Sequence, residues 1–336
     1  MTDSTARSTD LLQGLAKKPP PDKSNQREQL ALVVRVVVTL LLLGLLAWHL
    51  EISRIVSSLR TLDASWLAAS FAVVLAAIVV SAWKWGLILR ERGQRLPYTR
   101  LLRHYFVGLF FNNVLPTSVG GDAVRAWATT EDTGETPEAV ASVVSERLIA
   151  GVALGITALV GLPFVEDSSK LVVQVLAFLA IDFVLVSLFL FPKVAESIVG
   201  KLVPKKLQGL HSQIAATVVV VRETLWNWRL FIKIVAYSVF FQILVAAVNA
   251  CLFQALGVQV SLAQCVIYTP MIFTITMLPI SISGFGVREA AYWYFFSQVG
   301  VGQAEAVAAS LLFFVVVGIC SLPGAPLFVF GRKRLR

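Results

Sequence analysis

The feature that most constrains this chain is a series of long apolar runs separated by short polar stretches. Six of these runs lie at 31–50, 64–89, 139–162, 171–191, 230–256 and 303–330. A helix of about 20 apolar residues crosses the hydrocarbon core of a bilayer, and the runs lack the alternation of a transmembrane β-strand. Only 15% of the 336 residues are charged, against about 25% in soluble domains. The sequence therefore predicts an all-α polytopic membrane protein with six full transmembrane helices.

Two further runs, 101–116 and 262–278, are too short to cross the membrane. A helix over the first would be roughly 24 Å long, whereas the hydrocarbon core is about 30 Å thick. Each run ends at Leu-Pro and is followed by glycines and a second short stretch. We therefore expect two re-entrant helical hairpins, with Asp122 as the N-cap of the returning helix in the first.

The two breaks are copies of one another. The stretches 115–125 (LPTSVGGDAVR) and 278–288 (LPISISGFGVR) align without a gap at an offset of 163 residues. The identical pairs are Leu115/Leu278, Pro116/Pro279, Ser118/Ser281, Gly121/Gly284, Val124/Val287 and Arg125/Arg288. The sequence therefore predicts an internal repeat, with a first copy at about 64–162 and a second at about 230–330.

The basic residues indicate how the repeats are oriented. Of the 29 Lys and Arg, 21 fall in four clusters, at 1–30, 90–103, 192–233 and 332–336. If both short runs are re-entrant, all four clusters lie on one side, which the positive-inside rule makes cytoplasmic. The hairpins then enter from opposite sides, which is an inverted-topology repeat of the kind found in secondary transporters.

This topology predicts the domain organisation. Residues 1–30 form a disordered cytoplasmic tail, and 31–331 form a single transmembrane domain. A basic segment at 192–229 lies on the cytoplasmic surface, and both termini are cytoplasmic. Trp83-Lys84-Trp85 is interpreted as an interfacial anchor, and the acidic pair Glu131-Asp132 as part of a polar linker.

The two breaks suggest an anion site. A returning helix directs its N-terminal amides, and the positive end of its dipole, at the break. Arg125 and Arg288 add guanidinium groups suited to a phosphate or another anionic headgroup. The further candidate binding residues, which carry the breaks or flank them, are Ser118, Ser281, Asn112, Asn113, Gly120, Gly121, Gly284, Asp122, Glu146, Arg147 and Glu289.

An alternative assigns the two arginines a structural role. Arg125 would pair with Asp122 at i, i+3, and Arg288 with Glu289 or a partner on another helix. Ionisable residues at membrane depth are costly, so the binding interpretation is kept beside this one. Glu146 and Arg147 are adjacent and must face different partners; one of them faces Asp122 or the headgroup. Glu146 is a candidate proton carrier, and His104 a candidate headgroup or proton contact.

Several classes of chemistry have no support in the sequence. Cys251, Cys265 and Cys320 lie in apolar runs without ligand spacing, so we expect neither disulfides nor a metal site. A Walker-type loop and a metal-diphosphate motif are both missing, and we expect no cofactor. The basic excess has a topological use, so we expect no nucleic-acid partner.

The string at 112–125, with Ser145-Glu146-Arg147 and the later 284–289 (GFGVRE), resembles the flippase-like family. This family comprises the transmembrane region of lysylphosphatidylglycerol synthases and stand-alone bacterial and archaeal proteins. The likeness covers about 30–330 and implies lipid translocation in a prokaryotic cytoplasmic membrane, with aminoacylated phosphatidylglycerol as the substrate of the fused synthases. No aminoacyl-transfer domain follows the last run, so lysyl transfer is not expected here.

The leading prediction is therefore a flippase or transporter that moves an anionic or glycosylated lipid, phospho- or polyprenyl-linked, between leaflets. A second hypothesis is a membrane enzyme or accessory subunit that acts on a lipid phosphate or a polyprenyl-linked donor. A third is a non-transporting scaffold of a lipid-synthesis complex, which would tolerate neutral substitution of Arg125 and Arg288. Lipid-biosynthesis enzymes are candidate partners under each hypothesis.

Overall fold

The computed structural model describes residues 37, 44, 59–115, 120–164, 169–190, 208–277, 281 and 284–331. Within these ranges the chain is mostly helical and contains no strand. The predicted tail, the run at 31–50 apart from Val37 and Gly44, Ser118 and the first part of the basic segment lie outside the described residues. The elements are α4 (Ala64–Glu91), α5 (Tyr98–Val114), α6 (Gly120–Thr133), α7 (Thr136–Gly161), η1 (Leu162–Phe164), α8 (Ser169–Leu190), α10 (Gln208–Trp226), α11 (Trp228–Ala255), α12 (Leu262–Met277), α13 (Val287–Ser297), α14 (Gln303–Ser321) and α15 (Gly324–Gly331).

Four helical segments are long and apolar enough to cross a membrane: Ala64–Glu91, Thr136–Val160, Trp228–Ala255 and Gln303–Phe330. They coincide with four of the six predicted runs, and a fifth run forms the 22-residue helix α8. The all-α membrane class is therefore confirmed. The full number of spans and the re-entrant character of the hairpins remain predictions.

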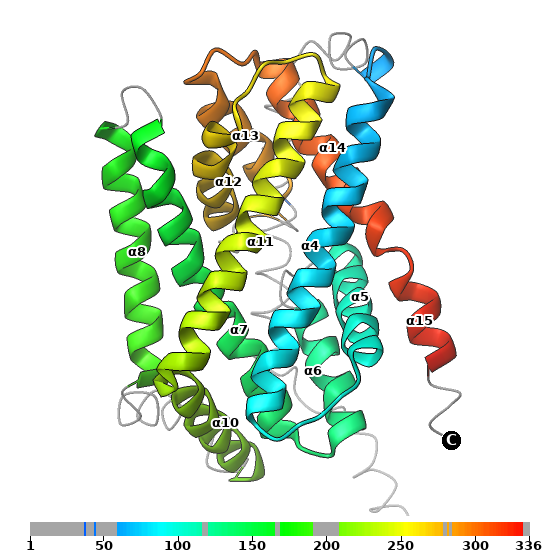
Figure 1. Ribbon diagram of the computed structural model, residues 1–336, viewed down its shortest axis with the longest axis vertical. Helices are drawn as coiled ribbons and strands as arrows, with labels where there is room; N and C mark the ends of the chain where they lie inside the picture. Colours follow the sequence, from blue (N-terminus) through cyan, green and yellow to red (C-terminus); the bar gives the residue numbers. More distant parts are fainter. Residues whose placement is uncertain are drawn as a thin grey trace, which may run out of the picture.

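Helices α4 and α11, which open the two repeats, pack side by side and run in opposite directions (Figure 1). At one end, the Asp63 amide donates a 2.9 Å hydrogen bond to the Ala255 carbonyl oxygen. At the other, Asn227 Nδ2 donates to Glu91 Oε1 at 2.7 Å. The start of each helix thus lies beside the end of the other, which is the arrangement expected of an inverted repeat.

The 163-residue offset extends from the breaks to whole helices. When the first and last residues of a helix in the first half are shifted by 163, they fall within four residues of the ends of a helix in the second half. The offset carries α4 to 227–254, α5 to 261–277, α6 to 283–296 and α7 to 299–324, and the corresponding helices are α11, α12, α13 and α14. The order and bounds of these helices therefore follow the same offset as the sequence repeat.

Each repeat contains a pair of short helices that pack against each other, α5 with α6 and α12 with α13. The two pairs extend into the bundle from opposite ends (Figure 1). Each also packs on the other repeat, since α5 contacts α14 and α15, and α12 contacts α7. Helices α5 and α12 have 17 and 16 residues, which gives each roughly 25 Å of length.

The predicted N-cap of the first returning helix is wrong. Helix α6 begins at Gly120, so Asp122 lies in its first turn and not before it. The side chain of Asn112 takes the capping role, because its Oδ1 accepts a 2.8 Å hydrogen bond from the Gly121 amide. The Asp122 carboxylate is free of that role and binds arginine side chains.

The last predicted run, 303–330, is divided into α14 and α15. Pro323 lies between them and has no backbone N–H with which to continue the hydrogen bonds of α14, although Leu322 before it keeps helical dihedral angles. Gly324 starts α15 directly against α5, where a Cβ would lie 2.3 Å from the Phe106 carbonyl oxygen. The absence of a side chain at Gly324 therefore permits this close approach.

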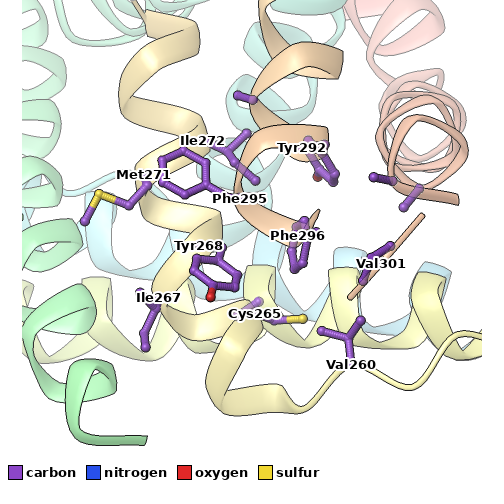
Figure 2. Packing of buried hydrophobic residues seen from close by; sticks show 14 of the residues in the cluster. Val260, Cys265, Ile267, Tyr268, Met271, Ile272, Tyr292, Phe295, Phe296 and Val301 are labelled. Atoms are coloured by element: carbon purple, nitrogen blue, oxygen red, sulfur yellow. The ribbon is translucent and has the colours of Figure 1, made fainter. Parts of the chain in front are cut away.

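Helices α12 and α13 form the second hairpin, and an aromatic cluster between them stabilises it (Figure 2). The Tyr268 ring lies 5.9 Å from that of Phe295 and 5.4 Å from that of Phe296, measured between centroids. Phe296 also packs on Phe253 of α11 at 4.4 Å. These contacts fix the buried face of α13, which carries Arg288 and Glu289.

Candidate functional site

Five charged side chains from α4, α6 and α7 form what we call the first-repeat cluster: Lys84, Asp122, Arg125, Glu146 and Arg147. Arg125 is 4% exposed, and its Nη2 atom lies 2.7 Å from Glu146 Oε2 and 3.6 Å from Asp122 Oδ1. Lys84 Nζ lies 3.4 Å from Glu146 Oε1. The cluster thus joins three helices through buried ion pairs.

Arg147 closes the cluster on its exposed side. Its Nε and Nη2 atoms donate to the two carboxylate oxygens of Asp122 at 2.7 and 3.0 Å. The Arg147 side chain is 47% exposed, whereas that of Glu146 is 5% exposed. The prediction that Glu146 and Arg147 face different partners, with one of them on Asp122, is confirmed.

The first-repeat cluster has more positive than negative groups. Three cations, Lys84, Arg125 and Arg147, surround two carboxylates, which leaves a formal charge of +1. Among the described residues, the buried Nε atom of Arg125 has no hydrogen-bond partner, and Nη2 lies 2.7 Å from Glu146 Oε2 without a well-aligned hydrogen bond to it. The Nε donor is therefore left without an acceptor in the described part of the protein.

Of the predicted interfacial anchor Trp83-Lys84-Trp85, only Trp83 is exposed. Trp83 is 39% exposed, but Lys84 and Trp85 are buried. Lys84 Nζ donates to Ser238 Oγ of α11 at 3.2 Å, in addition to its contact with Glu146. An anchor and a buried site share the same residue types, so the local sequence did not distinguish them.

Aromatic rings flank both repeated arginines. The guanidinium carbon of Arg125 lies 4.7 Å from the Trp85 ring and 5.2 Å from the Tyr105 ring. That of Arg288 lies 5.3 Å from the Phe285 ring and 5.0 Å from the Phe314 ring. Such cation–π contacts stabilise a desolvated guanidinium by about 2 kcal/mol. The sequence analysis did not identify these rings, three of which lie on neighbouring helices.

The second-repeat cluster consists of Arg288, Glu289 and Ser310, from α13 and α14. Arg288 Nη2 donates to Glu289 Oε1 at 2.8 Å, and Nε donates to Ser310 Oγ at 3.0 Å. The Ser310 hydroxyl donates to Glu289 Oε1, and Glu289 Oε2 accepts from the Gly286 amide at 2.6 Å. One cation meets one anion, so this cluster is formally neutral.

The candidate glycine, asparagine and serine residues at the two breaks differ in their surroundings. A Cβ at Gly121 would lie 1.9 Å from the Gly108 carbonyl oxygen, so α5 and α6 are in backbone contact there. Gly284 has a φ of 76°, which favours glycine. Asn113 Nδ2 donates to the Leu109 carbonyl oxygen. Ser281 is buried, and its hydroxyl makes no hydrogen bond with the described residues.

The two clusters share no residue in the described part of the chain. The ion pairs and hydrogen bonds of the first involve α4, α6, α7 and α11, and those of the second involve α13 and α14. The interpretation that Arg125 and Arg288 face one headgroup therefore stays a prediction. What the geometry provides is one charged centre in each repeat.

Asp132 lies in α6 and not in a polar linker. Its Oδ2 atom lies 3.2 Å from Nε2 of His104, and its Oδ1 atom lies 3.6 Å from Nη1 of Arg100. The side chains of His104 and Asp132 are 5% and 7% exposed. His104 thus has a carboxylate partner at the first hairpin, which the spacing of the sequence did not indicate. The side chain of Asp182 lies outside the described residues.

Comparisons with known proteins agree with this architecture. Residues 32–324 match the model of the lysylphosphatidylglycerol synthase TM region. A UPF0104 membrane protein of Methanothermobacter thermautotrophicus is 23% identical over 318 aligned positions, which cover 86% of this chain and 89% of the relative. Apolar helices and family membership together make this a multi-pass membrane protein. The chain belongs to the family of the lysylphosphatidylglycerol synthase transmembrane region.

Proposed function

We propose that this protein moves an anionic or glycosylated lipid, with a phospho- or polyprenyl-linked headgroup, between the leaflets of a prokaryotic cytoplasmic membrane. In this proposal the headgroup phosphate binds at the first-repeat cluster, and both chain termini are cytoplasmic. The family to which the chain belongs is related to membrane lipids, and that relation supports a lipid substrate.

The observation that carries the proposal is the uncompensated charge of the first-repeat cluster. An ion-pair network that served packing alone would be neutral, as the second-repeat cluster is. The first has a formal charge of +1, and the buried Nε atom of Arg125 has no acceptor among the described residues. A phosphate oxygen would supply both the missing charge and the missing acceptor.

The arrangement of the hairpins supports translocation over static binding. The helix pairs α5–α6 and α12–α13 extend into the bundle from opposite ends. In transporters with inverted repeats, discontinuous helices of this kind place the substrate between the two halves. Access from either end would then require only a change in how the two repeats pack.

A structural role for the second arginine is the alternative that the contacts favour most. Arg288 donates through Nε and Nη2 to Glu289 and Ser310 within its own repeat. A scaffold protein would use both arginines in this way and would tolerate their neutral replacement. The test must therefore separate stability from transport.

The test uses purified protein in proteoliposomes that contain phosphatidylglycerol with a fluorescent NBD headgroup label, followed by dithionite quenching. Arg125→Gln removes the excess charge and is expected to slow translocation at least about tenfold, the loss expected for one charge-assisted hydrogen bond. Arg125→Gln/Glu146→Gln removes both partners of the ion pair. It restores the formal charge of +1 but lacks the Arg125 donors, so we expect it to regain thermal stability relative to the single variant and to remain inactive.

Arg100→Gln is the matched control, because Arg100 is an exposed arginine beside the same hairpin. Its translocation rate should equal that of the wild type. Wild-type rates in both Arg125→Gln and Arg288→Gln would contradict the proposal and favour the scaffold. Recovery of transport in the double variant would show that Arg125 acts only through its ion pair.

A further inference from the structure

A second basic feature lies outside both clusters, where α4 ends and α5 begins. Arg90, Arg95, Leu96 and Pro97 line a hollow of about 590 Å³. Arg90 belongs to the last turn of α4, and the other three precede Tyr98, the first residue of α5. The hollow thus combines two cationic side chains with two apolar ones at the base of the first hairpin.

The arginines of this hollow are not neutralised by the described part of the protein. Neighbouring Arg92 donates to Glu138 at 2.9 Å and to Glu223 at 2.6 Å, which raises its pKa above the usual value. Arg100 lies 3.6 Å from Asp132. Arg90 and Arg95 are exposed, and no carboxylate of the described residues lies within ion-pair distance of either.

The surroundings of the hollow place it at the level of lipid headgroups. The Arg90 guanidinium lies 5.2 Å from the Trp83 ring, which meets the Tyr98 ring edge-on at 5.9 Å. Trp83 is 39% exposed on a helix long enough to span the membrane. Tryptophan and tyrosine mark the interface between hydrocarbon and water, and arginine pairs there bind lipid phosphates.

We propose that this hollow binds the phosphate of an anionic membrane phospholipid, of which phosphatidylglycerol is the simplest probe. Arg90 and Arg95 hold the phosphate oxygens, while Leu96, Pro97 and Trp83 contact the glycerol and the first acyl carbons. A lipid fits better than a soluble phosphate, because the cations lie beside exposed aromatic surface. The site is separate from the first-repeat cluster and does not depend on transport there.

The test measures lipid retention by native mass spectrometry of the full-length protein in detergent, after incubation with phosphatidylglycerol or phosphatidylcholine. Arg90→Gln/Arg95→Gln is expected to weaken phosphatidylglycerol binding about tenfold or more, which corresponds to loss of charge-assisted hydrogen bonds. Phosphatidylcholine retention should not change. Both arginines are exposed, so the variant should fold.

The control is Arg222→Gln/Arg229→Gln, which removes two exposed arginines near the same end of the bundle, one of them 5.6 Å from the Trp228 ring. This variant should retain phosphatidylglycerol as the wild type does. Equal losses in both variants, or no loss in either, would overturn the proposal. Displacement of phosphatidylglycerol by inorganic phosphate at equal concentration would also overturn it, in favour of a soluble anion.

Discussion

At the level of single residues, the two repeated arginines share an environment but differ in charge balance. Each is buried, flanked by two aromatic rings and bonded to a carboxylate. Lys84 and Arg147 add two cations around Arg125, whereas the described partners of the Arg288–Glu289 pair, Ser310 and the Gly286 amide, are neutral. The two arginines therefore occupy similar buried surroundings, but only the first-repeat cluster, as the described residues define it, has a formal excess of positive charge.

Gly121→Ala tests how closely the two arms of the first hairpin must approach. The new Cβ would lie 1.9 Å from the Gly108 carbonyl oxygen and 2.6 Å from Cγ of Asn112, so α5 and α6 would have to separate. We expect a loss of about 1–3 kcal/mol of stability from overpacking, measured as a lower Tm in detergent. The control is Gly318→Ala in α14, where nothing lies within 4 Å of the new Cβ. An unchanged Tm in Gly121→Ala would contradict the contact.

The site could be predicted from the sequence only where the partners are close along the chain. Pairing of Arg125 with Asp122, and of Arg288 with Glu289, was proposed from their spacing and is observed. The contacts of Lys84 with Glu146 and of Asp132 with His104 join different helices. These pairs depend on which helix faces meet, and no local pattern in a single sequence gives that information.

At the level of elements, the two hairpins are stabilised differently. The first relies on the backbone contact of Gly108 and Gly121 and on α15, whose Phe328 ring packs 5.0 Å from that of Phe111. The second relies on the rings of Tyr268, Phe295 and Phe296. Close backbone packing tolerates little change, whereas a cluster of large side chains can repack. The first hairpin is therefore the more sensitive to substitution.

Gly324→Ala tests whether α15 holds the first hairpin in place. A Cβ there would lie 2.3 Å from the Phe106 carbonyl oxygen and 2.7 Å from Cβ of Phe110, so α15 would have to move away from α5. We expect amide hydrogen exchange to become faster in both α15 and α5, because the packing of Phe328 on Phe111 would be lost. Exchange in α13, at the other hairpin, should stay as in the wild type. Unchanged exchange in α5 would show that the hairpin is stable without α15.

At the level of the whole molecule, one duplicated string predicted much of the architecture. The offset that aligns the two breaks also aligns α4 with α11 and α5 with α12. The division of the last run into α14 and α15 was missed, although Pro323 is present in the sequence. Prolines also occur inside intact helices, as Pro270 does in α12. Whether a proline ends a helix depends on what the freed segment can pack against, and here that is α5.

The orientation of the two repeats in the membrane leads to the last prediction. The antiparallel packing of α4 and α11 places equivalent loops at opposite ends of the bundle.

Single cysteines at Glu135→Cys, between α6 and α7, and Ser297→Cys, at the end of α13, replace exposed residues of equivalent loops. The three native cysteines are buried and can be changed to alanine to leave no other thiol. In intact cells, a membrane-impermeant maleimide should label Ser297→Cys at once and Glu135→Cys only after permeabilisation, because the basic segments are expected to be cytoplasmic. Labelling of both from one side would contradict the inverted topology. Labelling with the sides exchanged would keep the inversion but reverse the orientation that the charges predict.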